Sequence, residues 1–133
     1  MEKIIIAHYM GAYGPTVRID VHTMQWLVAL KDIIAKLADG IIDKIDFCQL
    51  ENAEISDINT FVLKKSDKNA CSEIAFSDNE NGFDIKWSEN VSQLNLISGL
   101  IDGLINADSS GHQYLADEEN GLLVELAYKE CDR

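Results

Sequence analysis

Apolar residues recur at steps of three and four in two separate stretches of this chain, and such spacing places them along one face of an α-helix. The first stretch predicts a helix over residues 24–39, with Thr23 as its N-cap and Gly40 as its C-terminal stop. The second follows Ser88, which we expect to be the N-cap, and Glu89, which we expect in the first turn. Its buried stripe is predicted to contain Val91, Leu94, Ile97, Leu100, Ile101, Leu104 and Ile105.

Two glycines, Gly99 and Gly103, interrupt the second predicted helix. A glycine in a helix interior costs about 1 kcal/mol relative to alanine. We expect their spacing of four to allow close packing of this helix against a strand or against the other helix.

Short segments rich in β-branched residues flank both helices, and they predict strands. Residues 3–9 and 16–22 are expected to form a hairpin, as are residues 72–77 and 82–87, which the turn signal Asn81-Gly82 connects. Further strands are expected within 41–50, 58–64, 112–116 and 122–128. Alternation in the second strand predicts that Val17, Ile19 and Val21 face the core, whereas Arg18, Asp20 and His22 face outward.

Together these elements predict an α+β fold with a mostly antiparallel sheet and two amphipathic helices packed on one face. The 133 residues are expected to form a single domain, residues 1–133. The first residues lack the pattern of a signal peptide, and the three cysteines include no C-x-x-C pair, so we expect a cytoplasmic protein with reduced thiols.

Negative charge is concentrated in the C-terminal half. The net charge is −12, and residues 71–133 contain 13 acidic and 3 basic residues. This balance argues against binding to nucleic acid or to an anionic membrane, both of which attract Lys and Arg. It favours a basic protein partner. The alternative interpretation is that the acidity only keeps the protein soluble.

No catalytic or metal-binding motif is apparent. The chain contains no G-x-S-x-G, and Gly11-Ala12-Tyr13-Gly14 lacks the Lys-Ser/Thr of a phosphate-binding loop. His8, His22 and His112 lie far apart in the sequence, although they are able to converge in a fold. We therefore expect no enzyme activity, no cofactor and no metal site.

Two acidic segments precede Asn-Gly turn signals: Asp78 with Glu80, and Asp117-Glu118-Glu119. They are interpreted either as a negative contact surface or as ordinary solvated turns. Arg18 is expected to form an ion pair with Asp20, two residues along the same strand face. The alternative role for Arg18 is to grip a carboxylate or a phosphate.

The segment Gly111-His112-Gln113-Tyr114-Leu115 follows the apolar helix and precedes the second acidic hairpin tip. With these neighbours, over residues 91–128, it resembles small immunity proteins encoded beside bacterial polymorphic and contact-dependent toxins. The resemblance implies a cytoplasmic, acidic α+β protein that binds a toxin domain and blocks it. It provides no catalytic residues. His112 and Tyr114 match the motif and are expected to share a strand face opposite Gln113.

These observations predict a partner-binding surface made of Asp78, Glu80, Asp117, Glu118, Glu119, His112 and Tyr114. The expected partner is a basic protein, for example a toxin nuclease domain with a basic cleft. Two alternatives remain at this point. One is a structural or regulatory interaction subunit unrelated to toxins, and the other is a small enzyme with a cleft near His112, Tyr114 and Arg18.

Overall fold

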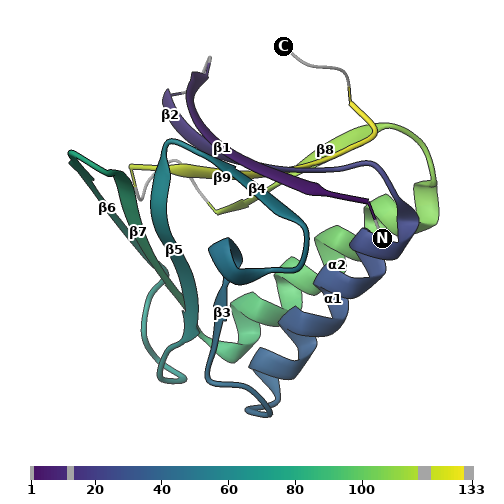
Figure 1. The fold of residues 1–133 in the computed structure, drawn as a ribbon. Coiled ribbons are helices and arrows are strands. Elements are labelled where there is room, and N and C mark those ends of the chain that lie inside the picture. Colours follow the sequence, from purple (N-terminus) through teal and green to yellow (C-terminus); the bar gives the residue numbers. More distant parts are fainter. Residues whose placement is uncertain (1, 12–13, 117–120, 131–133) are drawn as a thin grey trace.

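The computed structural model describes residues 2–11, 14–116 and 121–130 (Figure 1). Its helices are α1 (Met24–Ala38) and α2 (Val91–Ala107), and a short 3-10 helix covers Phe47–Gln49. Its strands are β1 (Ile4–Gly11), β2 (Gly14–Val21), β3 (Lys44–Asp46), β4 (Ala53–Ser56), β5 (Ile58–Lys65), β6 (Glu73–Asn79), β7 (Gly82–Glu89), β8 (Gly111–Ala116) and β9 (Leu123–Tyr128).

The strands form two sheets instead of the single sheet expected. The first has the order β4-β1-β2-β9-β8, and the second has the order β3-β5-β7-β6. Within them, β1 with β4, β2 with β9 and β5 with β7 pair in parallel, whereas the remaining pairs are antiparallel. The α+β class is confirmed, but both sheets are mixed.

Both helices lie on the same side of the five-stranded sheet (Figure 1). They pack against each other, and the Lys31 ammonium contacts the Asp102 carboxylate between them at 2.7 Å. Four residues of the predicted stripe of α2 are buried, namely Leu94, Ile97, Ile101 and Leu104. Leu100 and Ile105 are partly buried, and Val91, in the first turn, is 37% exposed. One hydrophobic core joins these helices to both sheets.

The first hairpin pairs as predicted, with Ile6 opposite Ile19 and His8 opposite Val17. Val17, Ile19 and Val21 are buried towards the helices. Arg18 and Asp20 lie on the opposite face, as predicted, but this face is covered at both positions, because each residue is more than nine-tenths buried. Strand β9 pairs with β2 on its far side, so β2 lies in the centre of the sheet and its outer side chains are enclosed by neighbours.

The second hairpin is also confirmed, although its turn lies one residue earlier than the Asn-Gly signal suggests. Asn79 pairs with Gly82, which leaves Glu80 and Asn81 as the turn residues. Gly82 has a φ of 119°, and a Cβ there would lie 2.9 Å from the Asp57 carbonyl oxygen. Glycine is therefore required at this position for both reasons.

The predicted start of the second helix is wrong. Strand β7 continues through Ser88 and Glu89, and Asn90 is the N-cap, accepting a hydrogen bond from the Gln93 N–H at 2.9 Å. Glu89 is buried, and its carboxylate accepts hydrogen bonds from Trp87 Nε1 at 2.9 Å and from the Ser72 hydroxyl, which replace its contacts with water. A buried acid with two donors belongs to the core of the sheet, and no helix dipole is needed to explain it.

The segment 41–50 contains much less strand than its β-branched residues suggest. Within this segment only β3 pairs with another strand, namely β5. The strand ends at Asp46, because the Asp46 carboxylate accepts a hydrogen bond from the Cys48 N–H at 3.2 Å and starts the 3-10 helix. Strand β4 was not anticipated. Asn52 and Asp57, with φ of 60° and 63°, bound it, and these left-handed residues confine β4 to four residues.

Alanine at Gly99 or Gly103 is expected to raise the free energy of unfolding by about 0.5–1 kcal/mol each. A Cβ at either position meets no atom within 4 Å, so the close packing expected from the sequence is absent there. Urea denaturation of the two variants measures the change. Gly82→Ala is the control, and we expect it to be destabilising because of the positive φ and the close Asp57 carbonyl. A loss of stability in Gly99→Ala or Gly103→Ala would contradict the prediction.

Candidate functional site

The structure places Asp78 and Glu80 at the exposed end of the β6–β7 hairpin. Two further acids, Asp57 and Asp84, belong to the same region, because Phe83 pairs with Asp78 and donates its N–H to the Asp57 carbonyl at 2.9 Å. We call Asp57, Asp78, Glu80 and Asp84 the acidic tip. Asp57 and Asp84 were not among the residues predicted from the sequence. Asp57 lies directly before β5, in a different segment from the hairpin, and Asp84 lies on β7, the strand that pairs with β6.

Hydrogen bonds from two neighbouring strands hold the acidic tip in place. The Asp84 carboxylate on β7 accepts from Thr60 Oγ1 at 2.8 Å and Asn59 Nδ2 at 2.9 Å on β5, and from Asn79 Nδ2 on β6. The bond from Thr60, followed by those from Asn59 and Asn79, holds the pKa of Asp84 below its usual range. Asp84 therefore stays ionised at neutral pH, and it joins three strands directly below the turn.

The nearest histidine does not neutralise the acidic tip. His8 lies with its ring centroid 3.8 Å from that of Phe83, on the face of β1 that points towards the core. Burial lowers the pKa of His8, and this effect exceeds the opposite influence of the Asp57 and Asp78 carboxylates. The ring is thus mainly neutral at pH 7, so the charges of the acidic tip remain uncompensated by it.

Strand β6 is an edge of the four-stranded sheet, with β7 as its neighbour. It has seven residues in regular register, whereas the other edges are shorter: β3 has three residues, β4 has four, and β8 has six with a register shift. Phe76 on β6 is 37% exposed. An aromatic side chain and a long strand edge therefore lie beside the acidic tip.

His112 and Tyr114 lie on one face of β8, as predicted, with ring centroids 5.4 Å apart in an edge-to-face arrangement. This is the outer face of the five-stranded sheet, opposite the helices. Tyr114 pairs with Glu125, and Glu125 pairs with Arg18, so the three residues proposed for a cleft do share a face.

Polar side chains on this outer face contact one another. Tyr9 Oη donates to Glu125 Oε1 at 2.6 Å, and Glu125 is completely buried. Arg18 forms the predicted ion pair with Asp20, at 3.5 Å. We call the following set the outer cluster: Tyr9, Arg18, Asp20, His112, Tyr114, Glu125 and Glu130.

Within the outer cluster, His112, Glu125 and Glu130 are able to hold a metal ion, since one ligand atom from each lies within 4.8 Å of the other two. Sequence reasoning missed both glutamates. The available signal was Glu125 itself, an acid in the middle of the otherwise apolar strand 122–128.

The predicted partner-binding residues therefore separate into two places. Asp78 and Glu80 belong to the four-stranded sheet, whereas His112 and Tyr114 lie on the edge strand of the other sheet. Asp117, Glu118 and Glu119 lie outside the described residues. The three histidines do not converge, because His8 faces the core side, His112 faces the outer side, and His22 contacts Asp20 at 3.6 Å.

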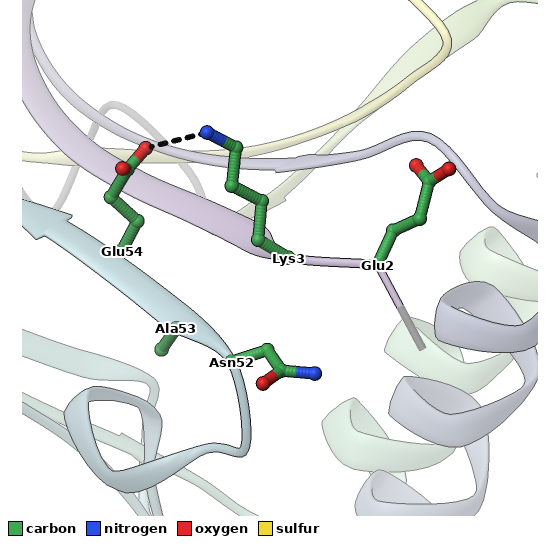
Figure 2. A pocket seen from close by; sticks show the side chains of 5 residues that line it. All are labelled: Glu2, Lys3, Asn52, Ala53 and Glu54. Carbon is green, nitrogen blue, oxygen red and sulfur yellow. Dashed lines mark ion pairs between the residues drawn. The ribbon is translucent and has the colours of Figure 1, made fainter.

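Figure 2 shows an open depression at the edge formed by β4 and the start of β1. Its lining consists of Glu2, Lys3, Asn52, Ala53 and Glu54. Lys3 and Glu54 form an ion pair of 3.4 Å, and both side chains are more than half exposed. This depression contains none of the predicted site residues.

Comparisons of the chain with protein-family models, with curated proteins and with solved structures found no match. In the part of the chain that the structure describes, neither helix has the length and apolar character needed to cross a membrane.

Proposed function

We propose that this protein is an acidic protein-binding module, an immunity protein that binds a cognate bacterial toxin domain in the cytoplasm and neutralises it. The acidic tip carries the proposal, because it gathers four carboxylates beside a long strand edge. The resemblance of residues 91–128 to immunity proteins of toxin systems supports the same function from a separate part of the chain.

The acidic tip suits binding because its shape exists before a partner arrives. Three side-chain hydrogen bonds to Asp84 connect β5, β6 and β7, and the Asn81 N–H donates to Asn79 Oδ1 at 2.9 Å within the turn. A preorganised surface loses less conformational entropy when it binds. Among the described residues, Asp78 and Glu80 form no ion pair, so a partner's cations do not have to displace one.

The neighbouring edge provides the remaining parts of an interface. The outer side of β6 offers backbone N–H and C=O groups to which a partner strand can add, and Phe76 offers an apolar anchor. Charged residues around an apolar centre are typical of protein interfaces.

The charge of the surface selects a basic partner. The net charge of −12 attracts a basic protein from a distance, which raises the association rate most strongly at low salt. A toxin nuclease domain fits this requirement, because a cleft that binds nucleic acid phosphates is lined with Lys and Arg. An acidic protein seated over such a cleft would exclude the nucleic acid.

Affinity capture tests the proposal. The immobilised protein is exposed to a lysate of the source cells at low and high salt, and bound proteins are identified by mass spectrometry. We expect one basic protein that is released as salt rises. Expression of that protein alone is expected to arrest growth of a bacterial host, and co-expression of this chain is expected to restore growth.

Charge reversal in the double variant Asp78→Lys/Glu80→Lys is expected to slow association with the captured protein by about tenfold or more at low salt. The matched control, Asp39→Lys/Asp43→Lys, changes the net charge equally on exposed residues near the end of α1. Stopped-flow mixing measures both rates. Equal rates for the two double variants would contradict a role for the acidic tip, and a captured protein that does not arrest growth would contradict the immunity function.

A further inference from the structure

Three potential metal ligands converge on the outer face from three different places in the chain. His112 comes from β8, Glu125 from β9, and Glu130 from the segment after β9. His112 Nδ1 lies 3.2 Å from Glu130 Oε2. One ligand atom from each of His112, Glu125 and Glu130 lies within 4.8 Å of the other two. Two ligands of one tetrahedral ion with bonds of about 2.0–2.1 Å lie about 3.3 Å apart. The spacing of His112 and Glu130 therefore already fits a shared ion.

The backbone turns Glu130 towards the other two ligands. Strand alternation places Glu125 and Ala127 on the outer face, and it would place Glu130 on the side of the helices. Lys129 interrupts the alternation with a left-handed φ of 55°, and its N–H donates to the Val21 carbonyl at 3.0 Å. This kink brings the Glu130 carboxylate to His112.

Neighbouring side chains orient the ligands. Tyr9 Oη donates to Glu125 Oε1 at 2.6 Å, and this hydrogen bond from β1 fixes the position of the Glu125 carboxylate. Tyr114 packs edge-to-face against the His112 ring. Hydrogen-bonded supports of this kind are a regular part of metal sites, and their loss typically costs ten- to a hundredfold in affinity.

The exposure of the ligands leaves a path for an ion. Glu125 is fully buried, whereas the side chains of His112 and Glu130 are 37% and 23% exposed. An ion held by all three residues would thus have protein on one side and solvent on the other. The imidazole suits a transition-metal ion such as Zn²⁺, and the two carboxylates also suit the harder Mn²⁺, so the set favours a divalent transition-metal ion over an alkaline-earth ion.

We infer that His112, Glu125 and Glu130 form a site for one divalent transition-metal ion, with Tyr9 as its supporting hydrogen-bond donor. The site is separate from the acidic tip and does not depend on the proposed immunity function. Metal binding is measured on the protein alone, so its outcome is independent of whether a toxin partner exists.

Isothermal titration of the untagged full chain with MnCl₂, and separately with ZnCl₂, tests the site. We expect one bound ion, and a loss of affinity of about tenfold or more in His112→Ala and in Tyr9→Phe. Mn²⁺ is the decisive probe, because exposed thiols such as that of Cys71 compete for Zn²⁺ but bind Mn²⁺ poorly.

His22→Ala is the matched control, since His22 is also partly exposed and also contacts an acid, Asp20. It is expected to bind Mn²⁺ as the unmodified protein does. Thermal melting in the absence of metal verifies that each variant is folded. A Kd for Mn²⁺ weaker than about 1 mM, or equal affinities of His112→Ala and His22→Ala, would show that His112 and Glu130 form only a hydrogen-bonded pair.

Discussion

Arg18→Leu is expected to lower the free energy of unfolding by about 3–5 kcal/mol, because it removes one partner of a buried ion pair. Arg18 and Asp20 are 8% and 6% exposed, and their charged groups lie 3.5 Å apart. Glu125, fully buried, is the Cα partner of Arg18 on the next strand. Without the guanidinium, the carboxylates of Asp20 and Glu125 remain on the outer face and lose its favourable field. Urea denaturation measures the loss.

A double variant separates the ion pair from the packing of the long arginine side chain. In Arg18→Leu/Asp20→Leu no charge of the pair remains, so we expect this protein to be more stable than Arg18→Leu alone. The opposite result is a double variant whose free energy of unfolding is lower than that of Arg18→Leu, so that the losses of the two substitutions add. It would mean that the effect of Arg18 is due to packing and not to charge.

Phe61→Ala is expected to destabilise the protein by about 3–5 kcal/mol, since it removes a large aromatic side chain from the middle of the core. Phe61 is 0% exposed. Its ring stacks on Phe47 with centroids 4.3 Å apart and lies 6.3 Å from the ring of Trp87. The cavity would separate the four-stranded sheet from the 3-10 helix. Denaturant unfolding followed by Trp fluorescence reports this loss.

Phe76→Ala is the control for the same chemical change at a surface position, because Phe76 is 37% exposed on the edge strand β6. We expect it to cost about 1 kcal/mol or less. Similar losses in the two variants would mean that the aromatic stack around Phe61 is not the centre of the core. If Phe76→Ala weakens capture of a basic partner while it leaves stability unchanged, Phe76 also acts as the anchor of the proposed interface.

Several features of the site were predictable because they depend on local spacing. The alternation in β8 placed His112 and Tyr114 on one face, and the separation of Arg18 and Asp20 by two residues predicted their ion pair. Asp78 and Glu80 were expected at a hairpin end, where turn chemistry and charge are both visible in a few neighbouring residues.

Other features depended on partners that are distant in the chain. The sequence predicted Glu89 in the first turn of a helix, whereas the structure places it at the end of β7, where Ser72 and Trp87 donate hydrogen bonds to its carboxylate. The spacing of Gly99 and Gly103 predicted close packing of α2, yet the space beside both residues is open. The prediction failed because spacing alone does not say which face of a helix contacts a neighbour. Asp57 and Asp84 joined the acidic tip only through the pairing of β7 with both β5 and β6.

Periodicity, turn residues and charge are all local. They were sufficient for the presence of both helices, for both N-terminal hairpin strands, for the α+β class and for the acidic character of the C-terminal half. Tertiary structure decided the rest. The parallel pairing of β2 with β9 joins residues more than 100 positions apart, buries Arg18 and Asp20, and places Glu125 beside them. Backbone groups form the same hydrogen bonds in every apolar strand, so they do not determine which strands pair. The packing of the whole core determines the pairing, and the pairing in turn determines which residues form the outer cluster.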